Sequence, residues 1–238
     1  MLTCLCDALY GEVGIAAVQV LEHCGVEVIF PENQTCCGQP AFNSGDWQTA
    51  SQLVNRLDQV FDPNLPIVVP SASCAAMLRH GRKLLKERFP QSAGDSLHAP
   101  VFELSEYLLN ELGLDRWPIR GSSISTPKKV AFHRSCHSRA IGLNDSAERL
   151  LSLVSRLEIV PFAEQEQCCG FGGAFSASQP TLSASIGKQK LMNFVESGIT
   201  QVLSGDMGCL MHLSSLATKE QIPLEFRHYV QVLAGELS

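Results

Sequence analysis

A pattern of cysteines that occurs twice is the feature that most constrains the fold of this chain. Between Cys4 and the adjacent pair Cys36-Cys37 lie 31 residues, and between Cys136 and the pair Cys168-Cys169 also lie 31. A glycine follows each pair, so the two CCG triplets begin 132 residues apart. Each triplet is in turn followed by one more cysteine.

That fourth cysteine has nearly the same place in both copies. Cys74 ends the stretch "VVPSASC" and Cys209 ends "QVLSGDMGC", at an offset of 135 residues. Eight of the ten cysteines therefore form two sets of four in the same order. Agreement of this kind is typical of an internal duplication, which has to be identified before the fold is assigned.

The pattern of apolar residues supports the duplication. In the second half it predicts alternating strands and helices over 128–136, 145–157, 158–162, 180–198, 200–205 and 209–220. In the first half it predicts, from a helix onward, the elements 12–25, 26–32, 46–61, 66–70 and 74–89. A further helix is predicted to close each half, over 101–113 and 225–237.

This alternation predicts an α/β fold of two pseudo-symmetric repeats, each a small parallel sheet flanked by helices. We expect the first repeat at 1–114, a linker rich in Gly, Ser and Pro at 115–128, and the second repeat at 129–238. One mismatch stands out: only three residues precede Cys4, whereas a full strand precedes Cys136. The first strand therefore looks clipped, and the natural N-terminus is expected to lie further upstream.

Charge and hydropathy exclude some classes of partner. The net charge is −6, and no basic stripe is interleaved with aromatic residues, which argues against nucleic acid and anionic membranes. No apolar run is long enough to span a membrane, and the first residues do not have the pattern of a signal peptide. The expected location is the cytoplasm, where clustered cysteines more often bind metal or carry out redox chemistry than form disulfides.

The predicted fold brings each set of four cysteines together. In an open parallel sheet, ligand sites form beyond the carboxyl ends of the strands, and each of these cysteines follows a predicted strand. Four convergent thiolates suit either Zn²⁺ or an iron–sulfur cluster. Zinc sites usually contain C-x₂₋₄-C turns, and no C-x-x-C occurs here. Adjacent cysteines suit two neighbouring irons of one cluster better than one ion, so the cluster is favoured and zinc remains the alternative.

Other residues near the motifs have weaker signals. Cys24 has no counterpart in the second half and is expected to be a core thiol, as is Cys6, which corresponds to Ser138. The histidines and the arginine around the second set are expected to be ordinary surface residues; they are His133, His137, Arg139 and His212. For His137 and Arg139 the alternative is a role in binding an anion or tuning the potential of a cluster.

The motifs resemble a known family. Two copies of C-x₃₁-CCG resemble the tandem cysteine-rich domains of the CCG-containing heterodisulfide reductase subunit and of the glycolate oxidase iron–sulfur subunit. The stretches "FPENQTCCGQPAFNSG", "CCGFGGAFS" and "GDMGCLMHL" are most similar to the lactate utilization protein A family. The resemblance covers essentially the whole chain.

The resemblance implies an iron–sulfur protein that takes part in oxidising L-lactate to pyruvate. The leading hypothesis is an electron-transfer subunit, and the sequence has no flavin or nicotinamide fingerprint. The resemblance also implies two partner subunits, one of them an iron–sulfur protein, and one [4Fe–4S] cluster per repeat. The ligands it implies are Cys4, Cys36, Cys37, Cys74, Cys136, Cys168, Cys169 and Cys209.

One departure from the family pattern concerns disulfide chemistry. Heterodisulfide reductase subunits have a fifth cysteine per motif, where this chain has Ser71 and Asp206. This favours a simpler cluster that transfers electrons, and Asp206 is expected to cap a helix rather than bind iron. The alternatives left open are a zinc-binding interaction module and an oxidoreductase subunit of the heterodisulfide reductase or glycolate oxidase kind.

Overall fold

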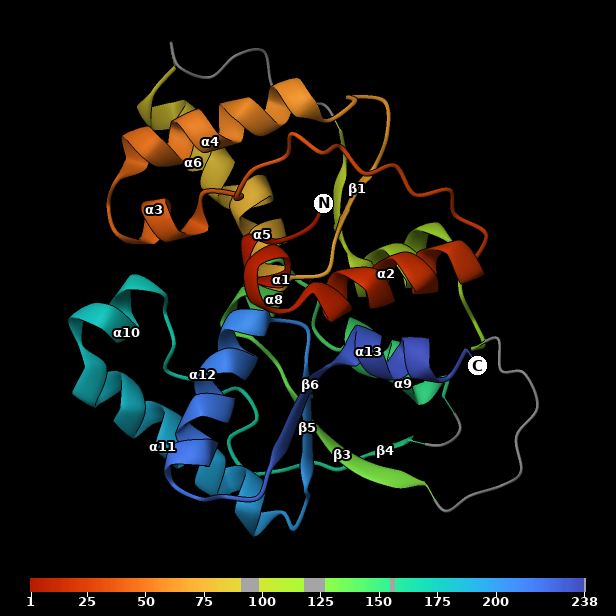
Figure 1. Ribbon diagram of the computed structural model, residues 1–238, viewed down its shortest axis with the longest axis vertical. Coiled ribbons are helices and arrows are strands. Elements are labelled where there is room, and N and C mark those ends of the chain that lie inside the picture. The colour runs from red at the N-terminus through yellow and green to blue at the C-terminus, as the bar shows by residue number, and fades with distance from the viewer. Residues whose placement is uncertain (91–98, 118–126, 155–156, 238) are drawn as a thin grey trace.

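The computed structural model describes residues 1–90, 99–117, 127–154 and 157–237, arranged as two α/β halves. The first half lies above the second in Figure 1. The predicted linker at 115–128 falls mostly on residues 118–126, which lie outside the described residues. Both halves contain parallel strands with helices packed around them, so the predicted α/β class and its two similar repeats are confirmed.

The second half has a four-stranded parallel sheet in the order β4-β3-β5-β6. Its strands are β3 (Lys128–His133), β4 (Leu157–Ile159), β5 (Gln201–Ser204) and β6 (Glu225–His228). Its helices are α8 (Cys136–Ala140), α9 (Ser146–Ser152), α10 (Ala174–Ser178), α11 (Pro180–Glu196), α12 (Met207–Lys219) and α13 (Tyr229–Gly235). Strand β3 ends at His133, three residues before the predicted end at Cys136.

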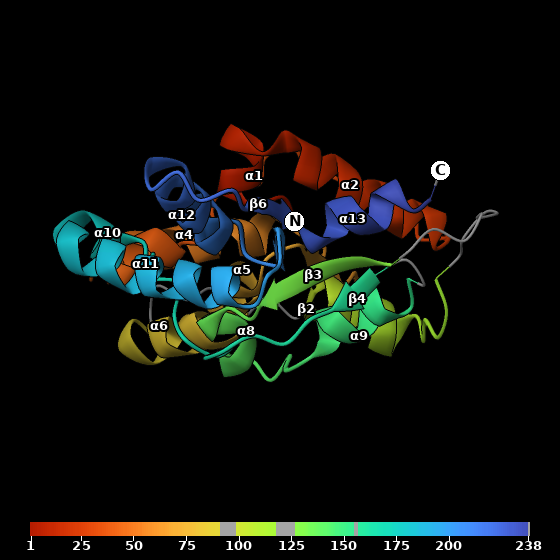
Figure 2. The same cartoon turned by 90° about the horizontal axis from the view of Figure 1, so that it is seen from below.

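The first half has only two paired strands among its described residues, β1 (Ile67–Val69) and β2 (Val101–Glu103), which are also parallel. Its α-helices are α1 (Cys4–Leu9), α2 (Gly11–His23), α3 (Gln39–Asn43), α4 (Trp47–Val60), α5 (Ala72–Ala76), α6 (Arg82–Arg88) and α7 (Leu104–Glu106). Two π-helical turns, η1 (Met77–Gly81) and η2 (Tyr107–Glu111), continue α5 into α6 and extend α7. Figure 2 shows α2 and α13 on one side of β3 and β4, and α9 on the other.

Helix ends follow local chemistry that the sequence displays. Helix α2 ends before Gly25, whose φ of 81° is one that residues with a side chain rarely adopt. Helix α4 begins after Asp46, whose carboxylate accepts a hydrogen bond from the backbone N–H of Thr49. These predicted helices are therefore present close to their expected bounds.

The two closing segments were predicted as helices throughout, and this was wrong at their starts. Val101–Glu103 and Glu225–His228 instead form β2 and β6, the outer strands of their sheets. Glu103 and His228 then cap the helices that follow: the side chain of each accepts a backbone N–H of the first turn, and its own backbone N–H donates to the side chain of the third helical residue. Such short strands leave a pattern of apolar residues that fits the first turn of a helix equally well.

The strand predicted over 26–32 was also wrong, because those residues pair with no strand in the part of the chain that the structure describes. In the second half the equivalent strand β4 pairs with β3. An apolar cavity of about 990 Å³ lies between α2, residues 26–31 and β1. Its lining includes Ile15 and Val18 of α2, and Val28, Phe30, Leu65 and Val68.

The two halves share a central hydrophobic cluster. It combines α2 with Leu104 and Leu108 from the first half, and α9, β3 and α13 from the second. Around it the halves exchange equivalent contacts: α2 packs on α13 and α9 on α7 and η2, while α1 contacts α12 and α5 contacts α8. Figure 1 shows α2 beside α13 in the middle of the molecule.

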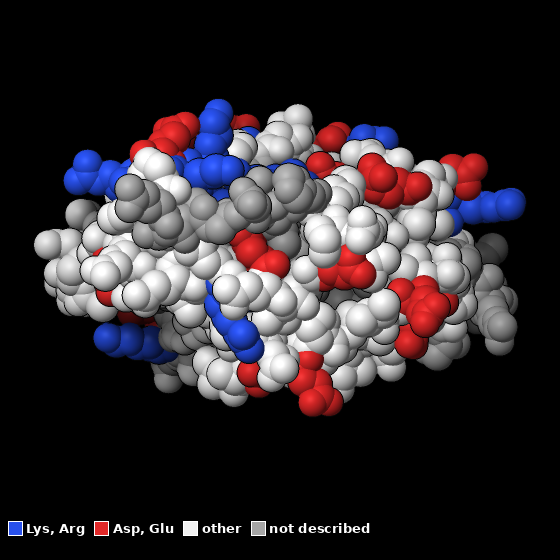
Figure 3. All heavy atoms as spheres, turned by 90° about the horizontal axis from the view of Figure 1, so that it is seen from above, with Lys and Arg blue, Asp and Glu red and all other residues white. Residues whose placement is uncertain are grey.

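The surface combines charges of both signs. On the face that Figure 3 displays, Lys and Arg side chains are scattered among Asp and Glu side chains, with broad uncharged areas between them. Among the described residues, no helix is long and apolar enough to cross a membrane.

Candidate metal centres

The motif cysteines of the second half lie beyond the carboxyl ends of β3, β4 and β5, as predicted, and in the first half Cys74 likewise follows β1. In the second half, Cys136 begins α8 just after β3, and Cys209 lies in the first turn of α12 after β5. The pair Cys168-Cys169 lies in the connection between β4 and α10. Cys4, Cys36-Cys37 and Cys74 occupy the corresponding places in the first half.

In the first half, the two adjacent cysteines contact different partners. The Sγ atom of Cys36 lies 3.6 Å from that of Cys4, and the Sγ atom of Cys37 lies 3.3 Å from that of Cys74. Cys37 and Cys74 are buried, Cys36 is half-buried and Cys4 is exposed. The four thiols therefore form one group that reaches from the core to the surface.

The second half repeats this arrangement. The Sγ atoms of Cys169 and Cys209 are 2.9 Å apart and buried, while Cys136 and Cys168 are exposed. Cys168 is hydrogen-bonded to the Cys136 thiol. The predicted convergence of the sulfur atoms is thus present in both halves.

In each group of thiols, one cysteine has a pKa far below that of a free cysteine. Hydrogen bonds from the Cys37 and Cys4 thiols lower the pKa of Cys36 to about 3. Hydrogen bonds from Cys136 and Cys169 lower the pKa of Cys168 to about 2. The neighbouring thiolate raises the pKa of Cys4, Cys37, Cys136 and Cys169 well above that of a free cysteine. Ionising a whole group therefore requires a nearby positive charge, which a bound metal supplies.

The glycine of each CCG triplet is required by the backbone. Gly38 and Gly170 have φ angles of 90° and 91°, and their N–H groups donate to the Sγ atoms of Cys36 and Cys168 at 3.5 and 3.3 Å. A Cβ atom on Gly170 would lie 2.5 Å from the carbonyl oxygen of Ser183. Both the left-handed conformation and the close backbone approach therefore exclude a side chain there.

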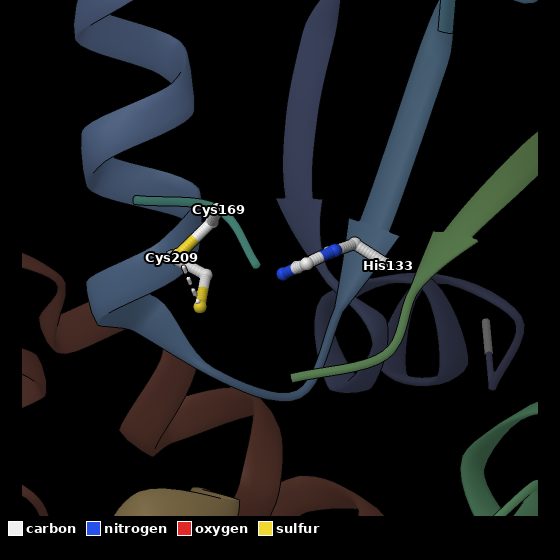
Figure 4. A group of neighbouring side chains, drawn as sticks. All are labelled: His133, Cys169 and Cys209. Atoms are coloured by element: carbon white, nitrogen blue, oxygen red, sulfur yellow. Dashed lines mark hydrogen bonds between the residues drawn. The ribbon is translucent and has the colours of Figure 1, made fainter. Parts of the chain in front are cut away.

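A buried imidazole adjoins the second group. His133 is the last residue of β3 and is 1% exposed, and its ring points toward Cys169 and Cys209 in Figure 4. One ring nitrogen and the two Sγ atoms all lie within 4.8 Å of one another. Burial, assisted by the charge of Lys190, lowers the pKa of His133 to about 3, so the ring is neutral at neutral pH.

The His133 ring nitrogens lack hydrogen-bond partners among the described residues. Burying a polar group without such a partner costs about 1–3 kcal/mol, which makes His133 an exception to the usual pairing of buried polar groups. In the sequence, His133 is one of several histidines near the cysteine motif, and nothing distinguishes it from the others. The direction of its ring depends on the sheet and leaves no signal in a single sequence.

Asp206 has the structural role that was predicted for it. One carboxylate oxygen accepts the N–H of Gly208 at 3.1 Å and caps α12, and the other accepts the N–H of Ser73 at 3.1 Å. Ser71 caps α5 in the first half through the N–H of Cys74. Both side chains that stand in place of a fifth cysteine thus hold helix starts, and Asp206 also joins the two halves.

Lys190 was not recognised from the sequence, because a lysine in a long helix usually lies on the surface. Its side chain is buried on α11 instead, and its ammonium group donates to the carbonyl oxygens of Glu164 and Gln165 at 2.7 and 2.9 Å. It also lies 4.6 Å from the centre of the Phe162 ring. The lysine therefore fixes the loop that leads into the second CCG triplet.

The remaining candidates have ordinary partners. Arg139 forms an ion pair with Glu166 at 3.2 Å, and the Nδ1 atom of His137 lies 3.7 Å from the Sγ atom of Cys136. Cys6 is buried in the central cluster and Cys24 packs against its edge, as expected of core thiols. His212 lies beside the second group, with Nε2 3.5 Å from the hydroxyl of Ser183.

Comparison with known proteins agrees with this geometry. The model of the CCG family of cysteine-rich domains matches residues 1–79 and 130–214, one segment in each half. The chain is 35% identical to lactate utilization protein A 2 of Bacillus cereus (strain Q1), over 100% of this chain and 97% of that protein. It is 34% identical to lactate utilization protein A 1 of Bacillus mycoides (strain KBAB4), over 98% of this chain and 94% of that protein.

Proposed function

The chain belongs to the CCG cysteine-rich family, among the lactate utilization A proteins, and from this premise we propose that it is an iron–sulfur subunit of a complex that oxidises L-lactate to pyruvate. The observation that carries the proposal is the pair of four-thiol groups at equivalent places in the two halves. In this proposal the chain carries electrons and acts only together with partner subunits, one of them a second iron–sulfur protein.

The residues present fit a cluster in each half, within 1–114 and 129–238. Adjacent cysteines that contact different partners, as Cys36 and Cys37 do, suit two irons of one cluster. The eight proposed ligands are Cys4, Cys36, Cys37, Cys74, Cys136, Cys168, Cys169 and Cys209. A [4Fe–4S] cluster bound there would supply one-electron redox chemistry, at a potential that its protein surroundings set.

The chain's own groups would tune such centres in three ways. Backbone N–H groups of Gly38, Gly170 and Phe171 donate toward cysteine sulfurs and stabilise their negative charge. The buried thiols exclude water from the inner side of each group. The exposed thiols Cys4 and Cys136 mark the outer side, from which we propose that electrons enter or leave. The cytoplasm, with its reducing conditions, is the proposed location for ten free thiols.

A zinc-binding interaction module is the second candidate. The observation in its favour is the short distance between sulfurs, 2.9 to 3.6 Å, together with the nitrogen of His133 nearby. Zinc binds cysteine sulfur at about 2.3 Å in tetrahedral sites, so its ligands also lie close to one another. Metal analysis separates the two candidates.

The test is a count of iron, zinc and acid-labile sulfide on protein purified without oxygen. We expect iron and sulfide in equal amounts, with about half lost in Cys36→Ser/Cys37→Ser and the other half in Cys168→Ser/Cys169→Ser. Cys24→Ser, outside both groups, is the matched control and should keep all the iron. Zinc without labile sulfide would refute the cluster and favour the second candidate.

The role in lactate oxidation needs a separate experiment. The chain is co-purified with its partner subunits and mixed with L-lactate in the absence of oxygen. We expect the visible absorption of the clusters to bleach on addition of L-lactate and not of D-lactate. If the protein contains iron but L-lactate never reduces it in the complex, the chain would still be a cluster-binding protein. The lactate-oxidising role would then be refuted.

A further inference from the structure

The two candidate centres differ by one buried side chain. His133 ends β3 in the second half, and the residue 132 positions before it is Met1. The first half therefore has four cysteines and no imidazole at the equivalent place. Figure 4 shows the His133 ring directed at the buried sulfurs of Cys169 and Cys209, and these come from a different loop and from α12.

The geometry around His133 is that of a ligand rather than of a core histidine. The ring is 1% exposed, and Cys169 and Cys209 are 3% and 7% exposed, so water does not solvate this group freely. The nitrogen and both sulfurs lie within 4.8 Å of one another, while both ring nitrogens lack partners among the described residues. Buried polar groups in proteins almost always have a partner, so an unpaired nitrogen beside two thiols indicates a bound ion or cluster.

The sheet holds the ring in this direction without using its nitrogens. His133 pairs with Ser204 in the ladder between β3 and β5, and the Ser204 hydroxyl donates to the His133 carbonyl oxygen at 3.0 Å. By contrast, the buried His228 uses one ring nitrogen: its Nδ1 accepts the N–H of Val230 at 3.2 Å and caps α13, while its Nε2 has no partner among the described residues. The described part of the chain thus contains one buried histidine with a clear structural use and one whose ring points at cysteines.

We propose that His133 is a nitrogen ligand of the metal centre in the second half. This rests on the proposed function, in which the second group of thiols binds a metal. The second half then offers five donors, four sulfurs and one nitrogen, where the first offers four sulfurs. Imidazole nitrogen is a common ligand of zinc and occurs at iron–sulfur clusters in place of cysteine. A neutral donor adds no further negative charge to a group already crowded with sulfur.

The test uses the full chain with Cys36→Ser/Cys37→Ser, so that only the second centre is filled. The chain is labelled with ¹⁵N-histidine, and a reduced cluster is measured by pulsed electron paramagnetic resonance. We expect a histidine nitrogen coupling that changes from ¹⁴N to ¹⁵N on labelling. If zinc is the bound metal, X-ray absorption is expected to show a nitrogen neighbour at about 2.0–2.1 Å beside the sulfurs at about 2.3 Å.

Two variants show which histidine produces the nitrogen coupling. His133→Phe keeps a ring of similar size and should lose the nitrogen coupling, while His137→Phe, beside Cys136 but only half-buried, should keep it. The labelled parent is informative even if His133→Phe does not fold, because bound metal without histidine coupling overturns the assignment. Coupling that persists in a metal-loaded His133→Phe also overturns it. A parent with no metal in the second half refutes the proposed function as well, so the two failures are distinguishable.

Discussion

The hydrogen bond between Tyr229 and Glu103 joins the two halves inside the central cluster, and its removal gives a measurable prediction. The Tyr229 hydroxyl donates to one oxygen of the Glu103 carboxylate at 2.8 Å, while the N–H and hydroxyl of Ser105 donate to the other. Both Glu103 and Tyr229 are buried. Tyr229→Phe therefore removes one of three donors from a buried carboxyl group and leaves the ring packing unchanged.

The size and pH dependence of the loss follow from the charge on Glu103. A hydrogen bond to a charged group contributes about 1.5–3 kcal/mol, and one to a neutral group about 0.5–1.5 kcal/mol. Burial raises the pKa of Glu103, and the Ser105 and Tyr229 donors act against that rise. A buried carboxyl with a raised pKa stabilises the fold at acid pH and loses that contribution as the pH rises. Removing Tyr229 as donor raises the pKa further, so the loss should be about 2 kcal/mol at pH 8 and about 1 kcal/mol near pH 4.

The assay is guanidinium unfolding of reduced, metal-free protein at both pH values, with thermal unfolding as a second measure. A loss of about 2 kcal/mol corresponds to a fall of about 4–8 °C in Tm for a chain of this size. Tyr107→Phe is the control, because Tyr107 packs against Phe102 in the same cluster and no hydrogen bond joins its hydroxyl to a described residue. Equal losses in both variants, or a loss that does not grow with pH, would refute the reasoning.

Three further predictions concern the two groups of thiols and the residues around them. Gly170→Ala should lower the free energy of unfolding by roughly 3 kcal/mol, because the cost of a left-handed conformation adds to the cost of a clash with the backbone. Gly142→Ala is the control: Gly142 also has a positive φ but lies in open space, so this variant should lose about 1 kcal/mol. Asp206→Ala should cost about 2 kcal/mol, because it removes a helix cap and a hydrogen bond between the halves. In metal-free protein, alkylation of Cys36 and Cys168 should be nearly independent of pH from 5 to 8, because their pKa values are lowered to about 3 and about 2 and both are already thiolates.

Each of these predictions has a contrary result. Equal thermal stability of the two glycine variants would show that the approach to Ser183 is not rigid. Asp206→Asn keeps a side-chain acceptor for the cap, so a loss as large as that of Asp206→Ala would count against the capping role. For alkylation, followed by mass spectrometry, Cys24 is the control and its rate should rise about tenfold per pH unit; the same slope at Cys168 would contradict the lowered pKa.

The duplication made much of the fold predictable from the sequence. Two copies of the same spacing implied two similar halves, and the alternation of strands and helices implied parallel sheets whose carboxyl ends collect the cysteines. Asp206 was expected to cap a helix and does so, because a capping side chain acts on its immediate neighbours. Asp46 at a helix start and Gly25 at a helix end act in the same local way. Local chemistry of this kind is visible in a single sequence.

Features that depend on contacts between residues far apart in the chain could not be predicted from the sequence. Residues 26–32 have the composition of a strand, but a strand exists only through its partner. Glu103 and His228 are unusual helix caps, so the sequence does not distinguish the short strands before them from the start of a helix. His133 and Lys190 acquire their roles from a sheet and a loop that bring together residues far apart in the chain. Periodicity shows which face of an element is apolar, and does not show what that face meets.

The exchanged contacts between the halves bear on the origin of the chain. Because α2 meets α13 while α9 meets α7, and α1 meets α12 while α5 meets α8, each contact has a counterpart with the roles reversed. This reciprocity is the signature of an isologous interface, the kind that two identical subunits form about a two-fold axis. A single-repeat ancestor would have buried this surface as a homodimer, and gene fusion would then have freed each copy to diverge. In a homodimer both copies have the same sequence, so a histidine present in one half alone, such as His133, requires the fused chain.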